Sequence, residues 1–206
     1  MNLKIVKKFL CICMFLGLFS VFSYASVNDT YDNESKELVA EYFRLSVIND
    51  DLIQANDILN SKKHDVLTYQ YDDFFDPFYY AVLNQQFEMV KLLLDAGVDS
   101  NHKDAEGVSM LHWAIAKENN SIANLLINDG ANISIQDTDG ATPLHWAAVI
   151  GSRSMISFLI QNGADIHSKD NWAYTPLDWA IIKGQNDVVE LLVTMDKYTK
   201  EKLVSL

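Results

Sequence analysis

The clearest pattern along the chain is a set of apolar residues at helical spacing that recurs every 33 residues. The recurring blocks are 71–103, 104–136, 137–169 and 170–206. Within block 137–169, Leu144, Ala147 and Ala148 fall on one face of a first short helix, and a second apolar series begins at Met155. Each block therefore predicts a pair of short helices separated from the next pair by a polar loop.

Capping residues mark where these helices begin and end. One repeat position holds a good N-cap residue in every block: Asp76, Ser109, Thr142 and Thr175. Proline follows at the first helical position in three blocks, as Pro77, Pro143 and Pro176. Glycine closes the second helix in the first three blocks, as Gly97, Gly130 and Gly163, and Asp196 stands there in the last. Because one helix pair cannot bury its apolar face alone, the blocks predict an all-α solenoid of stacked pairs.

The block sequences resemble the ankyrin repeat family, whose mark is a 33-residue unit with a T-P-L-H-x-A core. The segments "TPLHWAA", "NGADI" and "DAGVD" carry this resemblance, which covers about residues 71–198. It implies an all-α ankyrin-repeat solenoid of helix-turn-helix units with one β-turn finger per unit. It also implies that the stack binds other proteins.

The flanks of the repeats are less regular. Residues 38–70 predict a degenerate N-terminal capping repeat and its linker, and residues 26–37 predict a flexible lead. Residues 1–25 have the order of a secretory signal peptide: lysines, an apolar run over 9–22, and small residues around the predicted cleavage site after Ala25. An uncleaved N-terminal anchor is the alternative. We expect export, to the periplasm or the medium, with no stable membrane insertion once the signal is cleaved.

Cleavage would change the chemistry available to the chain. Both cysteines, Cys11 and Cys13, lie in the predicted signal, so the remaining chain would hold neither disulfides nor thiolate sites. The net charge of −12 would become 13 − 28 = −15, because three lysines leave with the signal. Such an acidic surface repels nucleic acid phosphates and favours a protein partner with a basic face.

The histidines and tryptophans of the repeats are predicted to be structural. His112 and His145 recur 33 residues apart, and so do Trp113, Trp146 and Trp179. A general base or metal ligand has no reason to recur with the repeat, whereas a residue that ties a loop or fills the gap between units does. An aromatic ligand-binding ladder is the alternative for the tryptophans. The other histidines, His64, His102 and His167, are interpreted as isolated loop residues. We predict no catalytic residue, no metal and no cofactor, with Thr142 and Pro143 completing the structural motif.

The partner-binding candidates are apolar residues that the repeat pattern does not require. Leu83, Val149, Ile150 and Ile182 are expected on the concave groove, and Phe75, Trp172 and Tyr174 on the loop fingers. The alternative is that these aromatics pack under the N-terminal cap or cover the last unit. We therefore predict a non-enzymatic protein-binding module. An accessory of a periplasmic stress-response enzyme, or a secreted effector acting on host proteins, remain alternatives, and the oligomeric state is open.

Overall fold

The computed structural model describes residues 34–69, 76–104 and 106–204, with side chains described for 36–69, 76–104 and 106–197. The chain divides into two compact units, 1–35 and 36–206, and the fold described below is that of the second. Its helices are α2 (Glu34–Ile48), α3 (Leu52–Leu67), α4 (Pro77–Leu83), α5 (Phe87–Asp95), α6 (Met110–Ala116), α7 (Asn120–Asn128), α8 (Pro143–Ile150), α9 (Arg153–Gln161), α10 (Pro176–Ile182) and α11 (Asn186–Val204). No strand is assigned in these residues, and the predicted all-α solenoid is confirmed.

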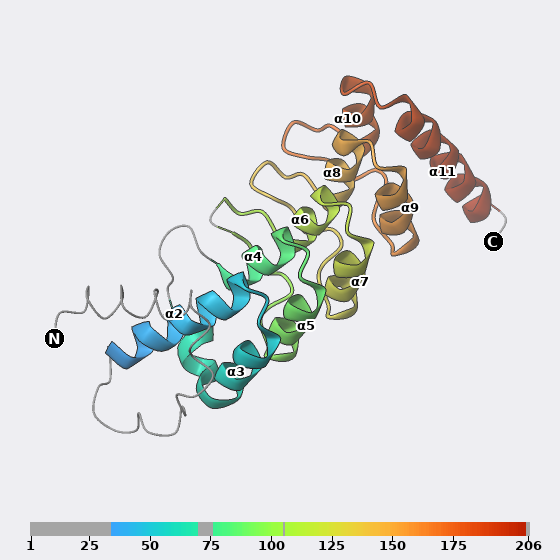
Figure 1. The fold of residues 1–206 in the computed structure, drawn as a ribbon. Helices are drawn as coiled ribbons and strands as arrows, with labels where there is room; N and C mark the ends of the chain where they lie inside the picture. The colour runs from blue at the N-terminus through green and yellow to red at the C-terminus, as the bar shows by residue number, and fades with distance from the viewer. Residues whose placement is uncertain (1–33, 70–75, 105, 205–206) are drawn as a thin grey trace. The chain divides into compact units, whose positions relative to one another are not determined.

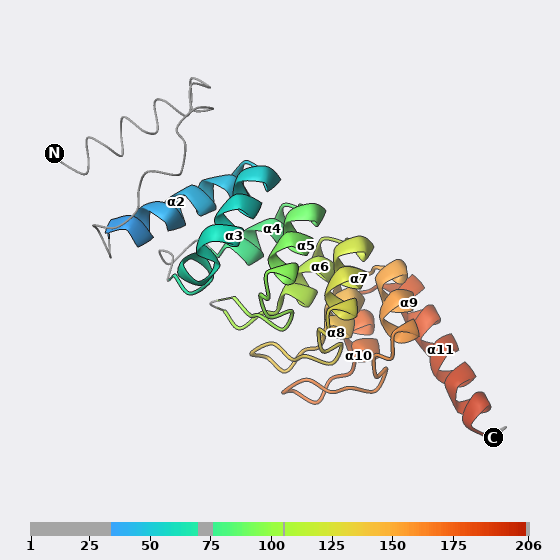
Figure 2. The same cartoon turned by 90° about the horizontal axis from the view of Figure 1, so that it is seen from below.

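The helices form pairs that stack on one another. The first helices of successive pairs pack in the order α4, α6, α8 and α10, and among the second helices α3 packs on α5, α5 on α7 and α9 on α11. Figure 1 shows the two rows, with long loops projecting beside the first helices. In Figure 2, which views the molecule from below, the same loops lie beside one another at α6, α8 and α10.

The N-cap residues start the first helices as the repeat pattern predicts. The Asp76 carboxylate accepts the backbone N–H groups of Phe78 and Tyr79 at 2.8 and 3.0 Å. Ser109 and Thr175 cap α6 and α10 through their hydroxyl oxygens. These bonds satisfy amides that have no partner inside the helix, so each short helix begins at a fixed residue.

The fingers are the long loops beside the first helices. Neighbouring fingers lie against each other, and Gly140 allows this close approach. Its φ of +76° belongs to the left-handed region, and a Cβ built there would lie 2.8 Å from the backbone nitrogen of Asn171. Asn171 belongs to the next finger, where its backbone N–H donates to Asp139 O at 3.0 Å and its side chain to Thr138 O at 3.1 Å. The finger of the last unit is therefore held by the finger before it.

The N-terminal pair differs from the expectation in two places. Helix α2 begins at Glu34, so residues 34–37 are helical and not part of a flexible lead. Apolar side chains at helical spacing bind this helix to the stack, with Phe43 fully buried, and a glutamate is favourable near a helix N-terminus. Helix α3 extends through most of the predicted linker to Leu67, with a kink at Lys62, and Val66 is buried.

Candidate functional site

Each of the last three units holds its finger to its first helix through one aspartate. One carboxylate oxygen accepts the indole N–H of the tryptophan nine residues later, in the pairs Trp113–Asp104 (2.6 Å), Trp146–Asp137 (2.8 Å) and Trp179–Asp170 (2.7 Å). The other oxygen accepts two backbone N–H groups of the finger itself. A charged acceptor with three donors is a strong arrangement, so the backbone of each finger is fixed.

In the last unit this arrangement displays two aromatic side chains. Asp170 accepts the backbone N–H groups of Trp172 and Tyr174, both at 2.9 Å. Their side chains remain 57% and 43% exposed, and the Tyr174 ring meets Trp179 edge-on with centroids 5.7 Å apart. Burial of Asp170 opposes its ionisation, but the hydrogen bond from Trp179 and those from the finger lower its pKa below the usual value. A rigid finger thus presents two large apolar surfaces to solvent.

The groove candidates divide into exposed and half-buried residues. Ile182 and Ile150 are 54% and 38% exposed. The side chains of Leu83 and Val149 are half-buried, so they offer less apolar surface than Ile182 and Ile150, and their assignment to the groove stays a prediction. At Val149 the cause is the next unit, because Gln185 donates from its side chain to the Val149 carbonyl at 3.1 Å and lies over this end of α8. Phe75 lies outside the described residues.

The repeated histidines tie the first helix of one unit to the finger of the next. His112 Nε2 donates to Ala141 O at 3.0 Å, and His145 Nε2 donates to Tyr174 O at 3.1 Å. A carbonyl only accepts, so Nε2 carries the proton, and Nδ1 of His145 accepts the backbone N–H of Thr142 at 3.1 Å. Both nitrogens are occupied in each ring, which leaves none for a metal or a substrate.

These two histidines are held neutral. Burial lowers the pKa of His112 to about 4, because the low-dielectric interior disfavours the imidazolium. Burial also lowers the pKa of His145. Acid–base catalysis near neutral pH needs a group that titrates there and reaches the substrate, and neither ring meets both conditions.

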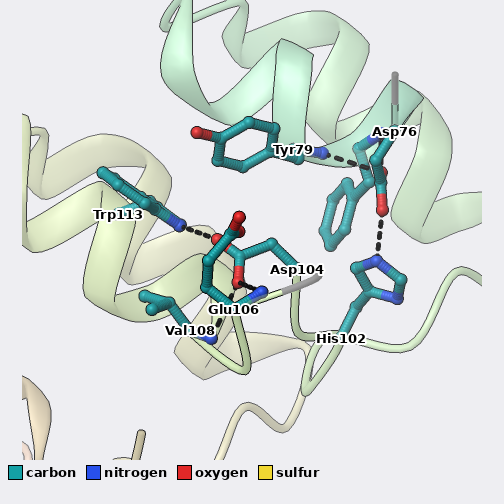
Figure 3. A network of polar contacts seen from close by, with 8 residues as sticks. Asp76, Tyr79, His102, Asp104, Glu106, Val108 and Trp113 are labelled. Atoms are coloured by element: carbon teal, nitrogen blue, oxygen red, sulfur yellow. Dashed lines mark hydrogen bonds and ion pairs between the residues drawn. The ribbon is translucent and has the colours of Figure 1, made fainter. Parts of the chain in front are cut away.

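The first unit uses another pair at this junction, shown in Figure 3. Tyr79 occupies the repeat position of the two histidines, and His102 Nε2 instead contacts the carboxylate of Asp76, the N-cap of α4. The hydrogen bond with Asp76 raises the pKa of His102 against the opposing effect of burial. For Asp76, burial is outweighed by hydrogen bonds from His102 and from backbone amides, so its pKa is lowered. The expectation that His102 is an isolated loop residue is therefore wrong.

His167 also has a partner that the sequence did not suggest. Its Nε2 lies 3.0 Å from an Asp196 carboxylate oxygen on α11. The expectation that it is an isolated loop residue is wrong as well. His64 lies in the last turns of α3 and not in a loop.

The aromatic rings of the first helices form edge contacts along the stack. Tyr79 meets Trp113 with centroids 5.5 Å apart, and Trp113 meets Trp146 at 5.7 Å. Both tryptophans are partly buried against the core and donate their N–H groups internally. Such contacts between units stabilise the stack, and they leave no slot between these rings for a flat ligand.

Ile181 and Val193 were missed by the sequence interpretation. They are 58% and 52% exposed in the last unit, although the preceding units bury the position of Ile181 and bury or half-bury that of Val193. No described helix pair packs against α10 and α11 from the side away from α8 and α9, which leaves these two side chains uncovered. Across the described residues, no three His, Cys, Asp or Glu side chains come together as a metal-binding group, and no helix combines the length and apolar character of a membrane span.

Comparison with protein families identifies the architecture. The model of ankyrin repeats (3 copies) matches residues 47–137 and 111–202, which is more than half of the chain. The chain therefore belongs to the ankyrin repeat family, and the predicted family is confirmed. Comparison with curated proteins gives no significant match. Ankyrin repeats are generally protein–protein interaction modules and typically serve as non-enzymatic scaffolds.

Proposed function

We propose that the chain is an exported, non-enzymatic scaffold whose C-terminal half binds a protein partner through its groove and fingers. The observation that carries the proposal is the finger of the last unit, where a fixed backbone leaves Trp172 and Tyr174 exposed. Ile182 and Ile150 add exposed aliphatic surface at groove positions. Aromatic side chains on a rigid backbone lose little entropy on binding and are common energetic centres of interfaces.

The repeat itself shows that the fold does not need these aromatics. The equivalents of Trp172 in the preceding fingers are Asp139 and Glu106, and those of Tyr174 are Ala141 and Val108. The preceding fingers keep the same aspartate hydrogen bonds with these smaller or charged residues. Exposed aromatics that are not needed for folding support a role in binding.

The net charge indicates what the partner offers. The chain carries −12 at neutral pH, and Glu106 and Asp139 lie exposed on the two fingers that precede the last one. A protein with basic side chains around an apolar contact would be attracted by this field. A nucleic acid would be repelled.

The binding surface is tested by giving the last finger the residues of the finger before it. The double variant Trp172→Asp and Tyr174→Ala copies Asp139 and Ala141, so the fold should be kept. Partners are captured on the wild-type protein from extracts of its own host and identified by mass spectrometry. We expect the double variant to bind at least about tenfold more weakly. The control is Ile53→Ala, which removes an isoleucine that is 78% exposed on α3. Equal capture by all three proteins would contradict the proposed surface.

Export is tested independently of binding. Cell fractionation with N-terminal sequencing should find a chain that begins at Ser26 outside the cytoplasm. Retention in the periplasm would favour a resident scaffold or an accessory of a periplasmic stress-response enzyme. Recovery from the medium would favour an effector that acts on host proteins. A full-length chain confined to the cytoplasm would contradict export and leave the binding surface unaffected.

A further inference from the structure

Helix α3 differs from the other second helices, α5, α7, α9 and α11, at two of its surface positions. The second residue of each of those four helices is polar, as Glu88, Ser121, Ser154 and Asp187, whereas α3 has Ile53 there. The sixth residue is apolar in the four, as Leu92, Leu125, Phe158 and Leu191, whereas α3 has Asp57. Residues four apart lie on one face of a helix, so both differences fall on the same patch of surface.

The fold does not account for either residue. A polar or acidic side chain suits the first turn of a helix better than isoleucine does, and Ile53 is 78% exposed. At the sixth position the other helices pack their apolar side chain against the core, whereas Asp57 is exposed. The two residues therefore give up contacts that the repeat would otherwise supply, which indicates a role other than folding.

A hollow lies beside these two residues, between α3 and α5. Its volume is about 410 Å³, and its apolar surface comes from Leu52, Ile53 and Leu92. Figures 1 and 2 both show α3 next to α5 in the row of second helices. Asp57 is shorter than the leucine or phenylalanine of the other units, so less side chain fills the space between these helices. Ligand sites in proteins span roughly 300–1,000 Å³, so the hollow has room for a partner's side chain.

Carboxylates surround this apolar surface. The charged residues that line the hollow are three acids and one lysine, namely Asp57, Glu88, Asp95 and Lys91. No ion pair among the described residues joins any of these four. The wider surroundings have the same sign, because residues 50–67 and 84–99 together hold seven acids and three lysines, a net charge of −4 with His64 neutral. An apolar surface with a negative rim favours a cationic partner and repels an acidic one, such as another copy of this chain.

We propose that this hollow binds a basic segment of a protein partner that carries one aliphatic or aromatic side chain. The apolar side chain packs against Ile53 and Leu92, and lysine or arginine side chains beside it pair with the carboxylates of the rim. The hollow shares no residue with the fingers, which project beside the first helices (Figure 1). It is therefore independent of the partner surface proposed above.

Titration of the purified protein, in the form that its host produces, with short peptides tests the proposal. The probe is a capped Lys-Lys-Leu-Lys-Lys peptide, followed through the methyl NMR signals of Ile53 and Leu92. We expect saturable shifts of both signals, and weaker binding at high salt because the charges of the rim are exposed. Two matched peptides, in which glutamate replaces every lysine or glycine replaces the leucine, should bind at least about tenfold more weakly.

Variants that copy other units test the assignment to this hollow while they keep the fold. Ile53→Ser supplies the residue of α7 and α9 at this position, and Asp57→Leu supplies that of α5 and α7. Each should weaken binding of the probe at least about tenfold, because the first removes the apolar contact and the second fills the hollow and removes a carboxylate. Leu38→Ser is the control, since it removes a leucine that is 41% exposed on α2, and it should leave binding unchanged. Circular dichroism checks that all three variants fold.

Three results would overturn the proposal. They are the absence of a saturable shift with the Lys-Lys-Leu-Lys-Lys peptide, equal affinity for all three peptides, and unchanged affinity in both variants of α3. The double variant Trp172→Asp with Tyr174→Ala should keep binding of the probe, and Ile53→Ser should keep capture through the fingers. Failure of one surface is therefore distinguishable from failure of the other.

Discussion

In the first ankyrin unit and in the two middle units, different side-chain contacts tie the first helix to a loop that comes later in the chain. In the first unit, Asp76 at the start of α4 pairs with His102. In the middle units, a neutral ring donates to a backbone carbonyl of the next finger, from His112 to Ala141 O and from His145 to Tyr174 O. The same kind of side chain thus serves once beside a carboxylate that raises its pKa and twice as a neutral donor with a lowered pKa.

The difference teaches that surroundings, and not residue type, set how each junction responds to pH. His102 is held by carboxylates, with Asp76 in contact and Asp99 and Asp104 nearby, and its pKa is raised. Its contribution to stability is present below the unfolded pKa of about 6.5 and is lost as the pH rises through the folded value. Burial lowers the pKa values of His112 and His145, so their contribution has the opposite sign: it is present above about 6.5 and is lost as the pH falls.

The largest contrast is expected when each histidine is truncated. His112→Ala should lower the free energy of unfolding by about 3 kcal/mol, because the ring is fully buried and its loss leaves the Ala141 carbonyl without its donor. His102→Ala should cost less than about 1 kcal/mol, since the pair with Asp76 is partly exposed. Urea denaturation at pH 7 measures both. Equal losses would show that the two junctions do not differ in strength.

The next contrast is the response to acid. The pKa of His112 is about 4 in the folded protein, so the unfolded chain takes up the proton first as the pH falls below about 6.5. Lowering the pH from about 7.5 to 5 should cost about 2 kcal/mol through this residue alone. His112→Gln keeps a side-chain donor and does not titrate, so the fall in stability should be smaller by that amount. An unchanged pH profile in this variant would contradict a buried neutral His112.

The family and the fold could be predicted from sequence because their signals recur. The 33-residue period and the N-caps at Ser109, Thr142 and Thr175 are repeated, and each copy supports the others. The start of α2 and the extension of α3 occur once, outside the period, and depend on packing against the first unit. No other unit holds a copy of these two features, so the repeat could not be used to predict where α2 begins or α3 ends.

The site was predictable only in part, because exposure depends on the neighbouring unit. Leu83, Val149 and Ile182 share one repeat position, yet Ile182 alone is exposed since no described unit follows it. The pair of Asp76 and His102 has no acid–histidine copy. The corresponding residues are Ser109 with Ile135, and Thr142 with Ser168, whose hydroxyl oxygens lie 3.5 Å apart. Both residues differ from those at the same positions of the other units, one as an acid and the other as a histidine. That joint difference was the signal that could have revealed the pair.

A smaller effect separates the two roles of Asp76, as a helix cap and as the partner of His102. Asp76→Thr supplies the cap residue that the chain uses at 142 and 175, and it removes the carboxylate. At pH 6 we expect a loss of less than about 1 kcal/mol, which shrinks as the pH rises and His102 loses its proton in the wild-type protein. Asp76→Ala also removes the cap and should cost about 1 kcal/mol more at every pH. If the two variants were equally stable at pH 6, the cap would contribute nothing here.

The smallest expected effect is that of salt, and it separates the two kinds of junction most directly. In one NMR titration, the pKa of His102 should lie above about 6.5 at low salt and fall toward that value at about 1 M NaCl, where the screening length is only about 3 Å. The pKa of His112 should change little, because burial and not a nearby charge lowers it. Asp76→Asn should remove most of the elevation at His102 without salt and leave His112 as it is. If salt moved both histidines equally, neither partial exposure of the first pair nor burial of the second would account for the difference between the units.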